Sequence, residues 1–579
     1  MSVLDPACGS GAFLFSALEE LERLYLATLD RLDDLGPEPA STADLSPSDA
    51  LRDAPNRRYA VLKAIVLNNL FGVDVVEEAV EICKLRLFLK LVAQIDAFEA
   101  LEPLPDVDFN IRAGNSLVGF ASRDSLRGGT QVRADLAGTI RELERRFEEV
   151  DHLTSEFRAS QDSHSADERL ALKGSLRRTL DALRDELDAE CARTYGVAPQ
   201  SAGYGRWRKD YQPFHWFLEF HEILASGGFD AIVGNPPYIE LRNLTTYSPR
   251  DYRTSTAGNL YAMFLERANS VVHAGGRQGF IVPVSSVSTD RYVDLQSLLA
   301  EHNLHFSSFD DRPSRLFDGL EHVRLTIHLI GQKSRDPVVM STRYHKWTAE
   351  ERPALFQVLR YADAWEPLVV GSLPKTGSPE ERGVADRLRT AKRRLAMHYV
   401  KHGSHAVYYT RKVGYFLQIL DFVPEMRDGM GRPRLPSELK ELRFASESQA
   451  TLALACLSST LFYWFVTVHS DCRNLNKREI DNFPVDLVEL GHSELASSLI
   501  DTTRSLMANL ISTSELRTLR SGGETLTVQF IYPRQSKHLI DRIDQALGTY
   551  YGLSDAENDF IQNYEIKYRL GVDDEDDGS

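Results

Sequence analysis

The sequence is poor in cysteine and has no cysteine pair at the spacing used for metal binding or redox chemistry. It has 579 residues and five cysteines, none of them in a CxxC pair. We therefore expect neither a disulfide framework nor a zinc site, and no bound metal. The first residues also lack a signal peptide, because Met1 leads directly into a short apolar stretch and a glycine-rich turn. These absences favour a cytoplasmic location.

Long hydrophobic runs are equally scarce. One uncharged stretch, residues 451–468, reaches the lower limit of length for a membrane-spanning helix. It contains five Ser or Thr residues, has no companion elsewhere in the chain, and is followed at once by a polar segment. We therefore expect a buried core helix there and no contact with a membrane.

The chain has no excess of positive charge. Its formal net charge is −17, from 67 Lys and Arg against 84 Asp and Glu, which is the wrong sign for a simple nucleic-acid binder. Part of the excess lies at residues 573–577, where we expect a solvated acidic tail. Local basic clusters matter more than net charge, and two stand out: Arg382, Arg387, Arg389, Lys392, Arg393 and Arg394, then Arg473, Lys477 and Arg478. Such groups suit phosphate contacts, with a solvated helix face as the alternative for the first cluster.

The chain is long enough for about three domains. Strand and helix signals alternate over residues 3–120 and return at residues 228–330, which predicts a parallel sheet covered by helices on both faces. A charged segment at about 125–200, with leucines at three- and four-residue steps, predicts an inserted helical hairpin that serves as a spacer or a packing arm. We place an α/β domain at 1–340, a mixed α+β domain at 341–490, and a helical region at 491–579.

Individual elements follow from the same patterns. We expect strands at 2–4, 69–75, 277–284 and 325–330, a strand and turn at 228–239, helices at 12–29 and 77–93, and a loop at 37–55.

A glycine-rich turn, Asp5-Pro6-Ala7-Cys8-Gly9-Ser10-Gly11, lies between the first strand and the first helix. Glycines let the backbone approach a ligand closely, and the helix N-terminus offers free N–H groups. The turn lacks the Gly-Lys-Ser/Thr of a Walker loop, and Leu14 replaces the third glycine of a dinucleotide fingerprint. The alternative is a tight turn without a ligand. Asp74, at the end of the second strand, can take both ribose hydroxyls of a nucleoside cofactor, or can be a helix cap.

A second turn, Asn235-Pro236-Pro237-Tyr238, follows the strand that begins at Phe229. The N6 amine of adenine is a poor nucleophile because its lone pair is delocalised into the ring. If the Asn235 side-chain oxygen and the Pro236 carbonyl each accept an N6 hydrogen, the lone pair is freed and the developing positive charge is favoured. The prolines fix the backbone, and Tyr238 offers a face for stacking on a base rotated out of the duplex. The alternative is an ordinary Pro-Pro turn.

Taken in this order, the motifs resemble those of the gamma-class adenine-N6 DNA methyltransferases, in particular the large enzymes of type IIG restriction–modification and of BREX and DISARM phage defence. The resemblance covers about 1–120 and 204–490, and Phe214-His215-Trp216 is part of it. It implies a Rossmann-like class I methyltransferase sheet, S-adenosyl-L-methionine as cofactor and double-stranded DNA as partner. Other restriction or phage-defence subunits are further expected partners. The segment 341–490 would be the target-recognition domain.

The resemblance also assigns individual residues. The methionine part of the cofactor would be held by the turn residues Asp5, Pro6, Cys8, Gly9 and Gly11, with Asp5 facing its amino group. Asp74 resembles motif II, and Asn115, within residues 111–117, resembles the motif that meets the cofactor's adenine edge. The catalytic residues would be Asn235, Pro236, Pro237 and Tyr238.

Two other functions use similar motifs. Protein-glutamine and RNA methyltransferases also hold a planar amide or amine with this kind of turn, but they usually lack a long C-terminal part. A non-catalytic DNA-recognition subunit is the second alternative, against which the intact Asp5, Gly9, Gly11, Asp74 and Asn235 speak. Members of the family also carry a segment before the glycine-rich turn that closes over the cofactor, whereas here the turn begins at residue 5. We therefore expect weak cofactor binding unless an upstream segment or a partner supplies that cover.

Overall fold

A computed structural model describes residues 1–35, 51–52, 54–95, 105–122, 124–125, 145–146, 150, 152–154, 156, 166–521 and 524–571. The predicted acidic tail lies outside these residues, as do most of the predicted loop at 37–55 and most of the first arm of the predicted hairpin. The chain forms two compact units. Unit 1 comprises Met1–Val282, Ser297–Leu304 and Ile327–Pro337, and unit 2 comprises Pro283–Gln296, His305–Thr326 and Val338–Ser579.

The main sheet has the strand order β3-β2-β1-β4-β5-β7-β6-β8-β9. Its strands are β1 (Val3–Asp5), β2 (Leu70–Asp74), β3 (Ile111–Ala113), β4 (Phe229–Gly234), β5 (Val272–Pro283), β6 (His302–Phe309), β7 (Leu325–Lys333), β8 (Val339–His345) and β9 (Ala362–Asp363). Neighbours among the first five strands in this order pair in parallel. The order reverses at β1, which lies between β2 and β4, as in a Rossmann-like sheet. The predicted α/β fold is confirmed.

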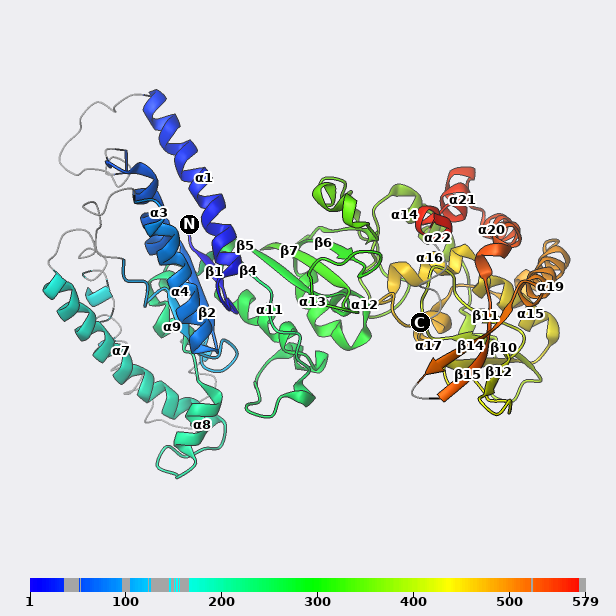
Figure 1. Ribbon diagram of the computed structural model, residues 1–579, viewed down its shortest axis with the longest axis horizontal. Helices are drawn as coiled ribbons and strands as arrows, with labels where there is room; N and C mark the ends of the chain where they lie inside the picture. The colour runs from blue at the N-terminus through cyan, green and yellow to red at the C-terminus, as the bar shows by residue number, and fades with distance from the viewer. Residues whose placement is uncertain are drawn as a thin grey trace. The chain divides into compact units, whose positions relative to one another are not determined.

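Three helices form the packed layer beside the first strands of unit 1 (Figure 1). They are α1 (Ala12–Leu35), α3 (Arg57–Asn68) and α4 (Glu77–Val92). Each buries an apolar stripe at three- and four-residue steps, and the stripes join Val3 and Leu70 in one core. The sequence predicted α1 and α4 but missed α3, whose apolar residues follow a polar stretch.

An aromatic cluster contacts the same strands through Phe71 of β2 and Phe229 of β4. The ring centroids of Phe71 and Phe229 lie 5.6 Å apart, and Phe220 lies within 5.7 Å of both. Phe214 and Trp216 extend the cluster. A strand side chain alternates between the two sheet faces, so the buried residues of β2 supply both layers.

The second arm of the predicted hairpin is a long helix, α7 (Ala166–Thr194), followed by α8 (Tyr204–Tyr211). Four leucines whose spacing predicted this arm are buried in one cluster: Leu176, Leu180, Leu183 and Leu187. Ion pairs add to this contact, because Arg184 on α7 pairs with the buried Glu219 at 2.8 Å. The remaining elements of unit 1 are α9 (Trp216–Glu219), α10 (His221–Ala225), η2 (Leu241–Asn243), η3 (Arg253–Ala257) and α11 (Leu260–Val271).

The uncharged stretch at 451–468 lies in the core of unit 2, but as two helices where we expected one. α15 (Glu447–Ser458) and α16 (Thr460–His469) are bent by 62° at Ser459. The Ser459 side chain accepts a hydrogen bond from the Phe462 N–H, so it caps α16 and interrupts the ladder. In the part of the chain that the structure describes, no single helix has the length and apolar composition of a membrane span; this bent pair has them only when its helices are taken together.

The C-terminal part of the chain shares this core. α19 (Ala496–Ser512), α20 (Lys537–Tyr551) and α21 (Asp555–Gln562) pack with α15 and α16 in one cluster. The predicted boundary near 490 therefore does not separate two hydrophobic cores. The assignment of residues 341–490 to a target-recognition domain remains a prediction. The helical character holds, but the sequence missed a hairpin, β14 (Glu515–Ser521) and β15 (Glu524–Phe530), to which β12 (Met426–Asp428) adds a third strand.

The remaining helices and strands complete the described part of the chain. They are α12 (Ser285–Ser288), η4 (Asp290–Tyr292), α13 (Val293–Ala300), η5 (Ala349–Ala354), α14 (Pro379–Arg389), η6 (Leu395–Met397), β10 (His405–Thr410), β11 (Ile419–Leu420), β13 (Leu439–Phe444), α17 (Lys477–Asn482), α18 (Leu487–His492), η7 (Pro533–Ser536) and α22 (Ile566–Gly571).

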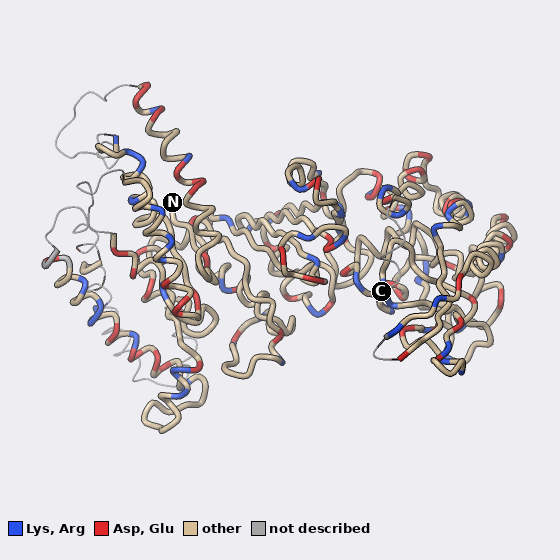
Figure 2. Tube along the Cα trace, viewed as in Figure 1, with Lys and Arg blue, Asp and Glu red and all other residues tan. Residues whose placement is uncertain are grey.

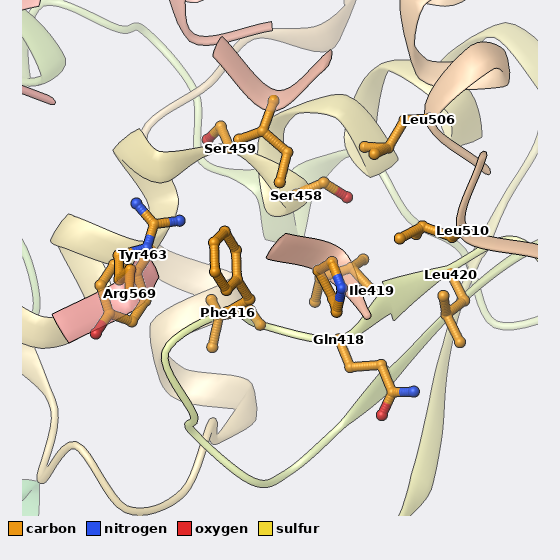
Figure 3. Close-up of a pocket in the computed structure, with 13 residues that line it drawn as sticks. Phe416, Gln418, Ile419, Leu420, Ser458, Ser459, Tyr463, Leu506, Leu510 and Arg569 are labelled. Atoms are coloured by element: carbon orange, nitrogen blue, oxygen red, sulfur yellow. The ribbon is translucent and has the colours of Figure 1, made fainter. Parts of the chain in front are cut away.

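A small cavity lies within the core of unit 2 (Figure 3). Its volume is about 20 Å³, room for one water molecule and too small for a nucleotide or cofactor. One wall carries the buried Ser458 hydroxyl, for which the described residues offer no hydrogen-bond partner. On another wall the Arg569 guanidinium lies 4.2 Å from the centre of the Phe416 ring and 4.9 Å from that of Tyr463.

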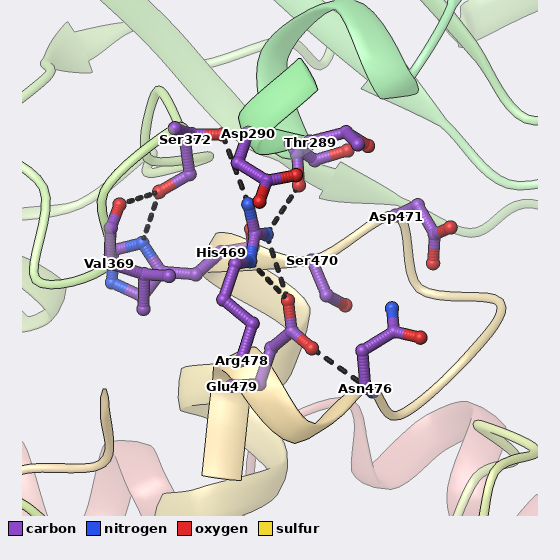
Figure 4. A network of polar contacts seen from close by, with 12 residues as sticks. Thr289, Asp290, Val369, Ser372, His469, Ser470, Asp471, Asn476, Arg478 and Glu479 are labelled. Carbon is purple, nitrogen blue, oxygen red and sulfur yellow. Dashed lines mark hydrogen bonds and ion pairs between the residues drawn. The ribbon is translucent and has the colours of Figure 1, made fainter. Parts of the chain in front are cut away.

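Arg478 is the centre of a polar network in unit 2 (Figure 4). Its guanidinium donates to the carbonyl oxygens of Ser288 (2.5 Å), Gly371 (3.2 Å) and His469 (3.2 Å), and pairs with Glu479 at 2.8 Å. These groups come from four separate segments of the unit. The Arg478 guanidinium is therefore committed inside the protein, and the expectation that its cluster contacts phosphates is wrong for this residue.

We predict that Arg478→Met lowers the free energy of unfolding by about 2–4 kcal/mol, because it removes the ion pair of the fully buried Glu479 and takes one hydrogen-bond donor from each of three carbonyls. Chemical denaturation would measure the loss. Arg473→Met is the matched control, since Arg473 is exposed and donates to the His322 carbonyl. If the Arg478 variant has normal stability but binds DNA more weakly, Arg478 contacts phosphate after all.

Candidate active site

The two predicted turns lie next to each other at the carboxyl ends of neighbouring strands. β1 ends at Asp5 and β4 ends at Gly234, and the two strands pair in parallel with Leu4 opposite Ile232. A Cβ on Gly234 would lie 3.1 Å from Asp5 Oδ1, which is closer than most neighbours tolerate. In open α/β sheets, ligands bind at this point, where the strand order reverses.

The glycine-rich turn has one crowded and one open glycine, and both need the left-handed backbone region that glycine tolerates. Gly11 has φ +86°, and a Cβ there would lie 2.5 Å from Cys83 Sγ on α4. Gly9 has φ +51°, and no atom lies within 4 Å of its Cβ position. The turn is tied to the sheet through Cys8, whose N–H donates to the Val73 carbonyl at 3.0 Å. Its backbone therefore has one face packed and one face open.

Two carboxylates line this turn. Asp5 is 1% exposed, and burial, opposed by the Ala7 N–H and reinforced by Asp74, raises its pKa to about 7. Asp5 Oδ1 accepts from the Ala7 N–H at 3.0 Å, and the Asp74 oxygens accept from the Gly9 N–H (2.8 Å) and the Val76 N–H (2.9 Å). Neither carboxylate has an ion-pair partner among the residues that the structure describes. The nearby cation Arg86 is directed to the Ser10 carbonyl instead, at 2.7 Å.

The loop after β3 braces the glycine-rich turn. The Ser116 hydroxyl donates to the Pro6 carbonyl at 2.6 Å, and Trp216 Nε1 donates to the Ser116 carbonyl at 3.1 Å. Asn115 is 2% exposed, and its Oδ1 accepts from the Leu117 N–H at 3.1 Å. The Asn115 side chain therefore shapes its own loop. Its predicted contact with a cofactor remains a prediction.

His215 connects the helical insertion to this loop. It is fully buried, with Nε2 3.0 Å from Asp188 Oδ1 on α7 and Nδ1 accepting from the Phe120 N–H at 3.3 Å. Burial lowers the pKa of His215, so the ring is a neutral brace with its proton on Nε2. From the sequence, Phe214-His215-Trp216, Ser116 and Gly234 were noted within or next to motifs but given no role, and Asp188 was missed. The contacts of these residues depend on partners that lie far away in the sequence.

The Asn-Pro-Pro-Tyr turn is held by its tyrosine. The Tyr238 hydroxyl lies 2.5 Å from Asn235 Oδ1 and 3.0 Å from the Ile281 carbonyl oxygen on β5. The Tyr238 ring packs edge-on against Tyr261 of α11, with centroids 6.1 Å apart. Pro236 is buried, whereas Asn235, Pro237 and Tyr238 are partly exposed. The amide and the aromatic ring are thus accessible from outside on a rigid backbone.

The basic clusters are partly paired within the protein. Arg382 lies near Asp363 (3.9 Å), Arg389 near Glu366 (3.6 Å) and Arg393 near Asp486 (3.5 Å). Exposed members of the two clusters that have no ion pair among the described residues are Arg387, Lys392, Arg473 and Lys477. Figure 2 shows Lys and Arg interspersed with Asp and Glu along the chain. Within the described residues, no three His, Cys, Asp or Glu side chains are grouped so that they could hold a metal ion.

Two protein families match the N-terminal half of the chain. Residues 68–312 match the Eco57I restriction-modification methylase family, and residues 1–118 match the DNA-methyltransferase domain of MmeI. The chain is also 29% identical over 350 residues to RM.MjaORFECS2P of Methanocaldococcus jannaschii, whose name describes a type II restriction enzyme and methyltransferase. That alignment covers 51% of this chain and 27% of the relative, so the chain spans about a quarter of that protein.

Solved structures of similar proteins include two DNA complexes. The type IIL restriction-modification enzyme MmeI has a TM-score of 0.43 and 10% identity, over 99% of this chain and 73% of that one. The ATP-dependent type ISP restriction-modification enzyme LlaBIII has a TM-score of 0.39 and 10% identity, over 91% of this chain and 40% of that one. Together the two family matches span residues 1–312, so this part of the chain is similar to DNA methylases of restriction–modification systems.

Proposed function

We propose that this chain transfers a methyl group from S-adenosyl-L-methionine to the N6 amine of adenine in duplex DNA. Within this proposal it is the modification component of a restriction–modification or phage-defence system and acts in the cytoplasm. One observation carries the proposal: the carboxylate-lined turn after β1 and the Asn-Pro-Pro-Tyr turn after β4 lie side by side, with Gly234 against Asp5. A cofactor on the first turn would be next to a base on the second.

The first turn fits the proposed cofactor. S-Adenosyl-L-methionine has an ammonium group, a sulfonium centre and two ribose hydroxyls, and it supplies the methyl group when bound. Asp5 offers the ammonium a carboxylate that pairs with no cation among the described residues, and Asp74 offers acceptors for the ribose hydroxyls. The open side of Gly9 allows close approach, while Pro6, Cys8 and Gly11 hold the turn in shape. Asn115 contributes through the loop that it stabilises.

The second turn fits an exocyclic amine. Asn235 Oδ1 and the Pro236 carbonyl can each accept one hydrogen from the adenine N6, which releases the nitrogen lone pair from the ring. Both acceptors also stabilise the positive charge that develops on this nitrogen. The two prolines keep them in place without reorganisation. The Tyr238 ring can stack on a base rotated out of the duplex.

The DNA contacts that we propose involve the free part of the first basic cluster. Arg387, in the last turn of α14, and Lys392, just after it, are exposed, so both can reach phosphates. The paired members Arg382, Arg389 and Arg393 would have to leave their acidic partners first. Phosphate contacts of this kind hold any DNA sequence and do not by themselves select a target site.

The central test is methyl transfer from labelled cofactor to duplex DNA, RNA and protein in parallel. We expect incorporation into duplex DNA and N6-methyladenine after digestion. Asn235→Ala should abolish incorporation while cofactor affinity, measured by calorimetry, stays nearly intact, because the change removes an acceptor for the amine. Asn243→Ala is the control, an exposed asparagine shortly after this turn that should keep full activity. Label in RNA or protein, or an equal loss of cofactor affinity in the Asn235 variant, would refute the assignment.

The ionised Asp5 carboxylate should lower the free energy of unfolding and strengthen cofactor binding. Because its folded pKa of about 7 lies above its usual value of 3.8, its ionisation destabilises the fold as pH rises from 4 to 7, and the cost is complete above 7. Asp5→Asn should therefore raise the free energy of unfolding by about 2–4 kcal/mol at pH 8 and hardly at all at pH 4, since one pKa unit is worth about 1.4 kcal/mol. The same change should weaken cofactor binding at pH 8.

The wild-type chain gives the complementary measurement. Its cofactor affinity should fall as pH decreases through 7, because protonation removes the carboxylate charge. Denaturation and calorimetry across this range would follow both effects. The exposed Asp386→Asn serves as control and should change neither. A pH-independent gain in stability, or unchanged cofactor affinity at pH 8, would show that Asp5 does not face the cofactor's ammonium.

Reversing the free charges of the first basic cluster should weaken DNA binding. We expect Arg387→Glu with Lys392→Glu to reduce affinity for every duplex alike and to lower the slope of log affinity against log salt by about 2, one per phosphate contact. Titrations at several salt concentrations would measure this. The control is Arg23→Glu with Arg178→Glu, which changes net charge equally at exposed positions on α1 and α7. If log affinity has the same slope against log salt in both double variants, the cluster is a solvated helix face and does not contact phosphates.

A further inference from the structure

The Tyr238 hydroxyl has two acceptors in reach and one proton to give. Asn235 Oδ1 lies 2.5 Å away, and the Ile281 carbonyl oxygen lies 3.0 Å away. The shorter distance identifies Asn235 as the acceptor that receives the proton. Burial raises the pKa of Tyr238, so the hydroxyl remains a donor at neutral pH.

This hydrogen bond engages the atom that the proposed reaction needs. The adenine amine must donate to Asn235 Oδ1, and in the free chain a hydroxyl already donates there. An amide oxygen has two lone pairs, but a short hydrogen bond to one of them reduces what the oxygen offers to a second donor. The tyrosine hydroxyl and the substrate amine therefore compete for the same acceptor.

The surroundings allow the hydroxyl to give way without a large movement. The Ile281 carbonyl is close enough to take the proton if the hydroxyl turns about its C–O bond. The Tyr238 ring can then remain packed near Tyr261, with its face available to a base. The exchange gives up the shorter hydrogen bond to Asn235 for a longer one to Ile281, so displacing the hydroxyl has a net cost.

We propose that the Tyr238 hydroxyl is a removable cap on Asn235, a role separate from stacking by the ring. In the free chain it satisfies the partly exposed amide and holds Asn235 Oδ1 in the direction from which an amine would donate. When a base enters, the hydroxyl turns to Ile281 and Asn235 becomes fully available. This proposal rests on the proposed function for its substrate, but the cap itself is a property of the free protein.

The cap is tested first without DNA. In a double-mutant cycle of Tyr238→Phe, Asn235→Ala and both together, we expect melting temperatures of the full chain to be non-additive, because each single change deletes the same hydrogen bond. The double variant should lose less than the sum of the single losses. Tyr361→Phe with Ser307→Ala is a positive control, since those hydroxyls lie 2.7 Å apart. Additive losses at Tyr238 and Asn235 would disprove the cap, whether or not the chain methylates DNA.

The second test uses the duplex that the wild-type chain methylates. Tyr238→Phe keeps the ring and removes the competing donor, so the KM for DNA should fall roughly two- to tenfold, the equivalent of one ordinary hydrogen bond. Tyr238→Ala should raise the KM because stacking is lost. Tyr361→Phe should leave the KM unchanged. If the wild type methylates DNA but the Phe variant has an unchanged or higher KM, the cap is overturned and the proposed function stands. If the wild type does not methylate DNA, the proposed function is refuted, and the double-mutant cycle alone decides whether the cap exists.

Discussion

The parallel pairing of β1 with β4 is the constraint on which the candidate site depends. The opposed residues Leu4 and Ile232 are 228 residues apart in the sequence, yet the pairing of their strands places Asp5 beside Gly234. A side chain at Gly234 would press on the Asp5 carboxylate, so the glycine allows the approach. The helices of unit 1 and the aromatic cluster around Phe71 hold these strands in place.

The site is costly for the fold. Asp5 is buried near Asp74 and has no ion pair among the described residues, and Gly9 leaves an open space above its backbone. Both features are unfavourable or neutral for folding and become favourable once a cationic, hydroxyl-bearing ligand is present. Regions that serve packing alone show the reverse pattern, as at Glu219, where the buried carboxylate is paired with Arg184.

Local patterns were enough to predict much of the fold. The strands at Asp5, Asp74 and Gly234 and the helices α1 and α4 follow from periodicity and turn chemistry, and so did the second arm of the hairpin. The missed features depend on tertiary contacts. Ser459 breaks an apolar run because its hydroxyl caps α16, which composition cannot show. Likewise, the sequence shows six basic residues between 382 and 394 but not that several of them face acidic partners.

The helical insertion gains a physical role from His215. α7 is more than a spacer, because Asp188 on this helix orients the His215 ring. The ring accepts a hydrogen bond from the Phe120 N–H, in the loop that also contains Ser116. Ser116 in turn holds the Pro6 carbonyl of the glycine-rich turn. Because His215 is neutral, it fixes the position of this loop without adding charge to the site. The negative potential around Asp5 therefore remains available to a ligand. The insertion is therefore part of the framework that fixes the glycine-rich turn.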